Sequence, residues 1–279
     1  MMKRVAIIGL GWLGMPLAAS LLAQGCYKVV GSKTRPEGIK AARISGITCY
    51  KLNLTPFPEG DADELASLFQ VDALVITLPA SRTLAGAENY FLAVQHVVKR
   101  ALSAAIPRII FTSSTAVYGE NHGVKHEGTP TSPCSPAGIC LVELENWLYQ
   151  LPNTSVDILR LSGLVGPGRH PGRFLAGQKS LSDGGHGVNL VHVTDVINAI
   201  TLLLQLPQGG YRYNLCAPRH PVKRDYYPAM ARVLGMSSPP VYLTENDGAR
   251  GGKIIDGSRI CKELGFKYRY PDPVIMPIA

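Results

Sequence analysis

Three glycines near the N-terminus have the spacing of a phosphate-binding loop. They lie in the segment Gly9-Leu10-Gly11-Trp12-Leu13-Gly14, which matches the pattern Gly-x-Gly-x-x-Gly. In a strand–loop–helix unit the first glycine makes a tight turn, the second lets the backbone approach a pyrophosphate, and the third lets the helix pack on the strand. The N-terminus of that helix also stabilises negative charge. The segment therefore predicts a dinucleotide site; the alternative is a glycine-rich turn without a ligand.

The residues that would meet the ribose of such a ligand are basic and hydroxylic. The segment Ser32-Lys33-Thr34-Arg35 ends an expected strand, and no carboxylate occurs between Gly14 and Glu37. NAD sites usually place an acidic residue here, which accepts from the ribose 2′-hydroxyl. Lys and Arg would instead pair with a 2′-phosphate, Arg bidentately. We therefore expect NADP, with NAD or a merely solvated basic turn as alternatives, and we expect Leu78 and Pro79 to line the same site.

The first half of the chain alternates strand-like and helix-like segments that would position these groups. Apolar runs typical of buried parallel strands occupy Val5–Leu10, Tyr27–Gly31, Ile47–Leu52, Asp72–Leu78, Arg108–Ser113 and Ser155–Leu161. Helical patterns separate them at Gly14–Gln24, Pro36–Ser45, Asp61–Phe69, Glu88–Ala105 and 137–151. Strict alternation of this kind predicts an α/β fold of the Rossmann type, with a doubly wound parallel sheet.

The pattern loosens after residue 162. A Gly-, Arg- and His-rich loop at 163–187 precedes an expected strand, Val188–Val193, and two expected helices, Thr194–Leu204 and Pro221–Leu234. We therefore expect a dinucleotide-binding region at 1–162. The region 163–279 would be a small mixed part that binds the substrate, completes the sheet and packs closely on the first region.

Composition and charge exclude several classes of protein. The chain has 279 residues, 46% of them hydrophobic and 17% charged, which fits a folded α/β protein rather than a coiled coil or a disordered chain. The net charge is +8, with the excess in residues 211–279, but there is no dense basic run, so we expect no nucleic-acid partner. No apolar run is long enough for a membrane span.

Cysteine usage and the N-terminal segment bear on the compartment. The six cysteines form no C-x-x-C pair and fit a reducing environment. Lys3-Arg4 and the apolar stretch up to Ala23 imitate a secretory signal, but a signal would not require the three loop glycines. We expect a cytoplasmic protein that keeps this segment.

The hydroxyl-rich end of the fifth strand resembles a known family. Ser113-Ser114-Thr115-Ala116-Val117-Tyr118-Gly119 is similar to the Ser-Ser-x-x-Val-Tyr-Gly segment of the extended short-chain dehydrogenases/reductases, the NAD-dependent epimerase/dehydratase type. Further segments resemble that family's motifs in the same order: 160–168 (Arg…Gly-Pro-Gly), 191–196 (Val-His-Val-x-Asp-Val), 213–215 (Tyr-Asn-Leu) and 256–266 (Asp…Ser-Arg…Leu-Gly-Phe). The resemblance implies a Rossmann fold, an NAD(P) cofactor and oxidoreductase or epimerase chemistry.

The chain departs from this family where the family transfers protons. The family's Tyr-x-x-x-Lys pair begins the helix after the Val-Tyr-Gly segment, but here Ala137 stands in place of Tyr and Leu141 in place of Lys. None of the 12 tyrosines has a lysine four residues further on. In the glycine loop, Ile8 also replaces the first glycine of the family's pattern. The resemblance therefore carries over one catalytic residue, Ser114, and Tyr118 is a weaker candidate that the family uses mainly for structure.

Other polar groups suggest substrate binding or structure. Arg169 and Arg173 lie in the glycine-rich loop and would hold a phosphate or carboxylate of the substrate, unless the loop is only a surface loop. His122 and His126 are four residues apart but lack a third ligand, so we expect no metal site. His192 lies in an apolar strand and is typical of a packed, hydrogen-bonded histidine.

Two functional hypotheses remain open. In the first, the protein is an NAD(P)-dependent oxidoreductase or epimerase acting on a small substrate, for which an anionic compound is one option. In the second, it is a catalytically silent dinucleotide-binding protein that senses redox state or serves a partner. The missing Tyr and Lys favour the second hypothesis. The retained Ser114 and the substrate-loop motifs favour the first, because hydride transfer is the chemistry of the cofactor and depends on the protein mainly for positioning.

Overall fold

The computed structural model describes residues 2–80, 83–175, 177–178, 181, 183–242 and 251–278. Part of the loop expected at 163–187 therefore lies outside the described residues. The chain forms two compact units, each discontinuous in sequence. Unit 1 comprises residues 1–117, 133–159 and 199–212, and unit 2 comprises 118–132, 160–198 and 213–279. This division differs from the expected boundary at residue 162, because the chain enters unit 2 at residue 118 and returns twice to unit 1.

A seven-stranded sheet organises the fold, in the order β12-β9-β7-β6-β1-β2-β3. Adjacent strands pair in parallel from β7 through β6, β1 and β2 to β3. The strands of this sheet are β1 (Lys3–Ile8), β2 (Tyr27–Lys33), β3 (Thr48–Lys51), β6 (Ala73–Ile76), β7 (Arg108–Ser114), β9 (Ser155–Leu161) and β12 (Arg212–Leu215). The strand order reverses direction between β1 and β6. Open parallel sheets bind ligands at such a switch point, beyond the carboxyl ends of the strands.

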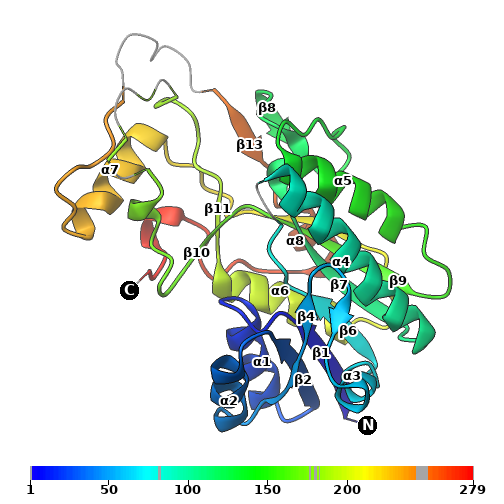
Figure 1. Cartoon of the computed structure of the whole chain (residues 1–279). Coiled ribbons are helices and arrows are strands. Elements are labelled where there is room, and N and C mark those ends of the chain that lie inside the picture. The colour runs from blue at the N-terminus through cyan, green and yellow to red at the C-terminus, as the bar shows by residue number, and fades with distance from the viewer. Residues whose placement is uncertain are drawn as a thin grey trace. The chain divides into compact units, whose positions relative to one another are not determined.

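Helices connect these strands and cover both faces of the sheet. Figure 1 shows α1 and α2 on one side of the strands of unit 1 and α4 and α5 on the other, as right-handed crossovers on the two sides of a switch point require. The helices are α1 (Gly14–Ala23), α2 (Pro36–Ile44), α3 (Ala62–Leu68), α4 (Leu84–Ser103), α5 (Pro136–Leu148) and α6 (Val193–Gln205). A short antiparallel hairpin, β4 (Asn53–Leu54) with β5 (Pro58–Glu59), follows β3.

Unit 2 contains two short parallel strand pairs, β10 with β11 and β13 with β8. Its elements are β8 (Gly123–Lys125), β10 (Gly163–Val165), β11 (Leu190–His192), α7 (Lys223–Val233), β13 (Lys253–Ile255) and α8 (Arg259–Leu264), with 3₁₀ turns η2 (Pro171–Arg173) and η3 (Pro273–Ile275). A further 3₁₀ turn, η1 (Thr115–Tyr118), follows β7. None of the helices among the described residues has the length and apolar character needed to span a bilayer.

The core of unit 1 is built on the central strands. Residues 5–8 of β1, residues 73–76 of β6 and residues 109–111 of β7 are fully buried, which explains why these strands are apolar without alternation. Unit 2 has its own apolar cluster, formed by Val165, Val188, Leu190, Ala217, Tyr226 and Met276.

The expected α/β fold with a doubly wound parallel sheet is confirmed. All six strands expected in residues 1–162 are present, and the strand expected at Val188–Val193 is β11. Helix α4 begins at Leu84 rather than Glu88 because the Thr83 hydroxyl accepts from the Gly86 amide and caps the helix earlier. The sequence analysis missed the seventh strand, β12, because Arg-Tyr-Asn-Leu is short and half polar.

Candidate dinucleotide site

A cavity of about 820 Å³ opens in unit 1 at the carboxyl ends of β1, β2 and β6. Its volume lies in the range of small-molecule and cofactor sites. Nine of the predicted cofactor residues line it: Gly9, Leu10, Gly11, Ser32, Lys33, Thr34, Arg35, Leu78 and Pro79. Sequence analysis missed the other lining residues: Glu37, Gly38, Leu52, Asn53, Leu54, Gly86, Asn89, Tyr90 and Ala93. Trp12, Leu13 and Gly14 are not among the residues that line this cavity.

The glycine loop is held from behind by two side chains. The Gly9 amide donates to Ser32 Oγ at 3.2 Å, and Thr77 Oγ1 donates to the Gly9 carbonyl at 2.7 Å. The Leu10 amide donates to the Ser32 carbonyl at 2.9 Å. Gly9 has a φ of 98°, which only glycine adopts without strain. Ser32, which lines the cavity, therefore also positions the loop.

Gly11 and Gly14 have different surroundings in the glycine loop. A Cβ on Gly14 would lie 2.2 Å from the Gly9 carbonyl oxygen, so this glycine is needed where α1 packs against the loop. A Cβ on Gly11 would have no atom within 4 Å. The space in front of Gly11 is open and belongs to the cavity, where a ligand could approach the backbone closely.

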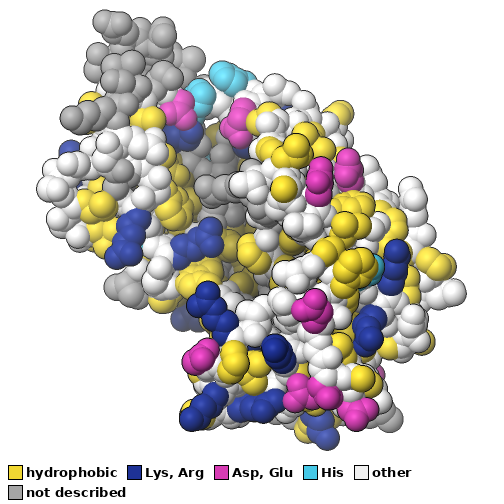
Figure 2. Space-filling model, in the orientation of Figure 1, with side chains coloured by type: hydrophobic (Ala, Val, Ile, Leu, Met, Phe, Trp, Pro, Cys, Tyr) yellow, Lys and Arg dark blue, Asp and Glu magenta, His cyan; other side chains and the backbone are white. Residues whose placement is uncertain are grey.

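The basic end of the cavity combines side chains with a helix terminus. Lys33 ends β2, and Arg35 is the N-cap residue of α2 with no side-chain cap hydrogen bond. Pro36 has no amide hydrogen, so the first amides available at this terminus belong to Glu37 and Gly38. Figure 2 shows Lys and Arg side chains gathered over the part of unit 1 that contains α2 and β2, with some carboxylates among them. This end of the cavity is suited to an anionic group, although the Glu37 carboxylate also lines it.

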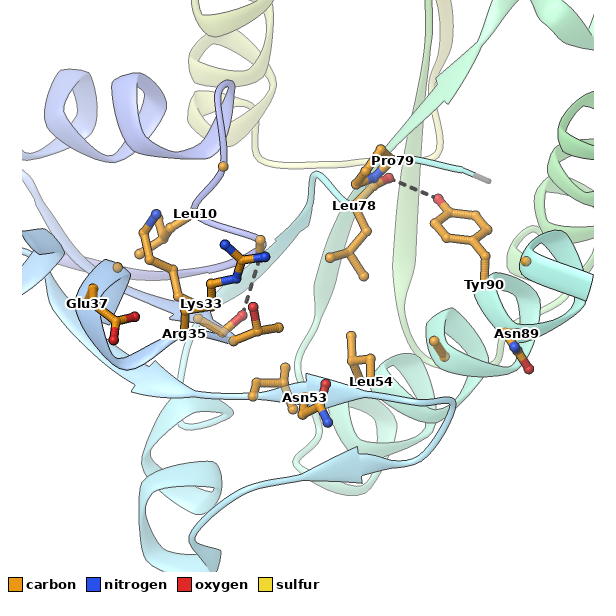
Figure 3. A pocket seen from close by; sticks show the side chains of 18 residues that line it. Leu10, Lys33, Arg35, Glu37, Asn53, Leu54, Leu78, Pro79, Asn89 and Tyr90 are labelled. Carbon is orange, nitrogen blue, oxygen red and sulfur yellow. Dashed lines mark hydrogen bonds between the residues drawn. The ribbon is translucent and has the colours of Figure 1, made fainter. Parts of the chain in front are cut away.

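The opposite end of the cavity is mainly apolar. Figure 3 shows Leu54, Leu78 and Tyr90 across from Lys33 and Arg35. The Tyr90 hydroxyl donates to the Leu78 carbonyl at 3.2 Å, and burial raises the pKa of this phenol, so Tyr90 is a neutral wall rather than an acid. The apolar surface suits the flat ring of a nucleobase. The sequence contains only a weak indication of these lining residues. Asn53 and Leu54 could have been found because they directly follow an expected strand, whereas Asn89 and Tyr90 belong to a helix with a mixed pattern.

The hydroxyl side chains at the end of β7 fall into two groups, those hydrogen-bonded within the core and one that is accessible. Thr112 donates to the Ile76 carbonyl at 3.0 Å, and Ser113 Oγ donates to Glu145 Oε1 at 2.6 Å; both groups are buried. The half-buried Ser114 accepts from the Ala116 amide at 3.2 Å. Among the described residues no acceptor is found for its hydroxyl proton, so the arrangement is compatible with the predicted catalytic role of Ser114.

Tyr118 lies within unit 2 in a buried polar network. Its hydroxyl accepts from Arg160 Nη1 at 2.8 Å and lies 2.8 Å from Asn214 Oδ1 and 3.1 Å from the His126 carbonyl oxygen. Only 1% of the residue is exposed, and burial raises the pKa of the phenol. Its single proton is already directed at two acceptors. This geometry favours a structural function and speaks against Tyr118 as the proton donor.

The helix that should carry the Tyr–Lys pair contains no substitute acid at those positions. Leu141 on α5 is 3% exposed and belongs to the core, whereas Ala137, one turn earlier, is half-buried. Between them, the Cys140 thiol donates to the Ala87 carbonyl at 3.3 Å, and burial raises the pKa of the thiol to about 11. Cys140 is therefore a protonated, inert side chain near neutral pH.

The candidate substrate residues lie on the surface of unit 2. Arg169 and Arg173 are both exposed, beside the buried His170, whose Nδ1 accepts from the Gly172 amide at 3.0 Å. His192 is hydrogen-bonded at both ring nitrogens, to the Thr194 amide and the Pro277 carbonyl, which confirms that it is a packed histidine.

The sequence of the chain matches the NAD dependent epimerase/dehydratase family over residues 5–216. The chain therefore belongs to this family.

The most similar proteins include one of near-equal length. Protein YeeZ of Escherichia coli (strain K12) is 60% identical over 277 residues, covering 99% of this chain and 100% of that protein. Solved structures that share the fold include the following two. A putative NAD-dependent epimerase/dehydratase from Methylobacillus flagellatus has 25% identity and a TM-score of 0.72, covering 98% of this chain and 96% of that one. A UDP-glucuronic acid 4-epimerase from Bacillus cereus, in complex with NAD, has 18% identity and a TM-score of 0.75, covering 95% and 94%.

Proposed function

We propose that the protein binds a nicotinamide adenine dinucleotide in the cavity of unit 1. The pyrophosphate would lie against the loop Gly9–Gly14, the adenosine ribose at the end of β2, and the adenine against the apolar wall. The observation that carries this proposal is the contrast at the loop: Gly14 is needed for packing, whereas the space in front of Gly11 is open. The structure with NAD from Bacillus cereus supports the same class of ligand.

NADP is the form of the cofactor that the cavity favours. Lys33, Arg35 and the N-terminus of α2 together offer two cations and first-turn amides that have no side-chain cap among the described residues, where a 2′-phosphate would lie. Glu37 is the one acidic side chain that lines the cavity among the described residues, and it would suit the 2′-hydroxyl of NAD. Two cations against one carboxylate make the 2′-phosphate the better match, and NAD is the alternative.

The reaction proposed is oxidoreductase or epimerase chemistry on a small anionic substrate. The cofactor supplies the hydride transfer, and Ser114 would orient the reacting oxygen of the substrate. We propose that Arg169 and Arg173 bind anionic groups of the substrate. The UDP-glucuronic acid named for the Bacillus cereus relative is one example of a substrate with such groups. The six free cysteines are compatible with the reducing cytoplasm, where this chemistry would take place.

A catalytically silent dinucleotide-binding protein is the second candidate. It is favoured by Ala137 and by the buried Leu141 at the positions of the family's proton-transfer pair. A silent protein would bind the cofactor in the same cavity but would not oxidise or reduce it.

Calorimetry with NADP⁺ and NAD⁺ tests the cofactor site. Gly11→Asp should abolish binding of both, because a carboxylate would fill the open space with negative charge, while the thermal midpoint stays within about 2 °C of wild type. The control is Ala19→Asp, which adds the same charge at an exposed position of α1. Wild-type protein that binds neither cofactor at millimolar concentration, or Gly11→Asp protein that still binds, would refute the proposal.

Turnover decides between the enzyme and the silent protein. Oxidation of NADPH should be followed with a panel of carbonyl compounds and nucleotide-sugars, for wild type and Ser114→Ala. Turnover that falls at least tenfold in Ser114→Ala supports the enzyme. Turnover unaffected by Ser114→Ala shows that this serine is not catalytic, and binding of cofactor without any turnover across the panel favours the silent protein.

A further inference from the structure

The side of the cavity that would meet the nucleobase carries the amide of Asn53 among apolar neighbours. This inference rests on the proposed dinucleotide site. Asn53 begins β4, one residue after the end of β3, and lines the cavity with Leu54, Leu78 and Ala93. Beyond the glycine loop of β1 and the ribose contacts at the end of β2, the next strand in the sheet is β3, which leads into Asn53 and Leu54. Leu78 and Ala93 line the cavity from the segment after β6 and from α4. A base between these apolar side chains would present its edge to the Asn53 amide.

The orientation of the Asn53 amide is set from outside the cavity. Its Nδ2 donates to Glu59 Oε2 at 3.2 Å and to Thr55 Oγ1 at 3.4 Å. Thr55 does not select the orientation, because a hydroxyl both donates and accepts. An ionised carboxylate only accepts, so Glu59 must face the NH₂ group. The β4–β5 hairpin pairs Asn53 with Glu59 and so holds the two side chains at one register position.

With its NH₂ group held by Glu59, Asn53 turns its carbonyl oxygen toward the cavity. Figure 3 shows the Asn53 oxygen on the cavity side and its nitrogen on the opposite side. The edge of the base therefore meets an acceptor. A purine with a 6-amino group donates to such an acceptor, whereas a 6-oxo purine places a second acceptor against it.

We propose that Glu59 is a positioning residue that makes this site selective for 6-amino over 6-oxo purine dinucleotides. Glu59 does not touch the ligand; it fixes which end of the Asn53 amide the ligand meets. The pair thus gives a neutral amide the recognition properties of an acceptor-only group, without placing a negative charge beside the anionic cofactor.

The test compares NADP⁺ with nicotinamide hypoxanthine dinucleotide phosphate, using the dissociation constant of each measured by calorimetry. Wild type should bind the adenine form about tenfold or more tightly, since a mismatched buried polar contact changes affinity by that order. Glu59→Lys places a donor next to Asn53, so the amide should turn its NH₂ group to the cavity, and the preference should vanish or invert. The added positive charge acts on both ligands equally and cancels in the ratio.

Two further variants separate positioning from a structural effect. Glu143→Lys makes the same charge change at an exposed position of α5 and should keep the wild-type ratio. Asn53→Asp combined with Glu59→Lys should restore the preference for adenine, because both carboxylate oxygens accept and neither needs positioning.

Three results are decisive. Failure of wild type to bind either ligand refutes the proposed dinucleotide site itself. Binding of both ligands within twofold refutes only the selectivity. A ratio in Glu59→Lys equal to that of wild type refutes the role of Glu59.

Discussion

The cavity of unit 1 and the polar network of unit 2 use similar side chains in opposite ways. In the network, Asn214 is completely buried and contacts Tyr118 Oη at 2.8 Å through its Oδ1. The side-chain Nδ2 of Asn214 donates to the carbonyls of Lys125 and Asp256, and its backbone amide donates to Glu127 Oε1. In the cavity, by contrast, Asn89 is exposed at the wall of a large opening. The side chains of the network stabilise the fold, whereas the side chains of the cavity wall are available to a ligand.

This difference explains what the family-like motifs mean. Tyr118, Arg160, Asn214 and Asp256 come from four separate motifs, and all four meet in the network of unit 2. Asp195, from a fifth motif, accepts from the amides of Arg269 and Tyr270. These motifs therefore identify the fold. They carry little information about the reaction, which explains how the chain can match the family while lacking its Tyr–Lys pair.

The largest effect is expected from truncating the amide at the centre of the network. Asn214→Ala should lower the free energy of unfolding by about 3 kcal/mol or more, because Tyr118 and two backbone carbonyls lose a buried partner. The matched change in the cavity, Asn89→Ala, should alter stability by less than about 0.5 kcal/mol. Urea unfolding measures both. Equal losses would remove the contrast between the two regions.

Two of the three loop glycines, Gly11 and Gly14, give the next largest difference. Gly14→Ala should destabilise the protein by about 2 kcal/mol, since its methyl group would overlap the Gly9 carbonyl. Gly11→Ala should leave stability within about 0.5 kcal/mol and weaken cofactor binding. Thermal unfolding and cofactor titration of both variants separate fold from ligand. Destabilisation by Gly11→Ala would mean that its position is not open.

Removing one hydroxyl from the network should have a smaller effect. Tyr118→Phe should lower the free energy of unfolding by about 1.5 kcal/mol, because Asn214 Oδ1 and the Arg160 guanidinium lose a partner. The affinity for the cofactor should not change. Urea unfolding together with calorimetry checks this, and any turnover that disappears selectively in Tyr118→Phe, at unchanged fold, would reinstate Tyr118 as a catalytic residue.

The smallest change in free energy is expected at the basic end of the cavity. Arg35→Ala should weaken NADP⁺ binding about tenfold, or about 1.4 kcal/mol, by removing one contact of a 2′-phosphate. Binding of NAD⁺ and the free energy of unfolding should stay nearly the same, because Arg35 is exposed. Calorimetry with both cofactors gives the comparison. Tighter binding of NAD⁺ than NADP⁺ by wild type would assign the site to NAD.

The sequence alone was sufficient for the fold class and for one end of the site. Apolar runs such as Val5–Ile8 must be buried on both faces, and their alternation with helices leaves few topologies besides a doubly wound sheet. The glycine spacing and the segment 32–35 are local in sequence. Parallel strands end at a common edge, so local information was enough to bring these groups to one cavity.

Tertiary structure decided which polar residues are available and which are already engaged. Ser113 and Ser114 are neighbours in sequence, yet Ser113 donates to Glu145 whereas Ser114 keeps its proton available. The orientation of the Asn53 amide likewise depends on a residue across a hairpin. Hydrogen-bond partners distant in the chain determine such roles, and composition and spacing do not encode them. The availability of a polar group is thus a property of the packed structure, because burial removes the competing water and leaves each donor only the acceptors that the fold places beside it.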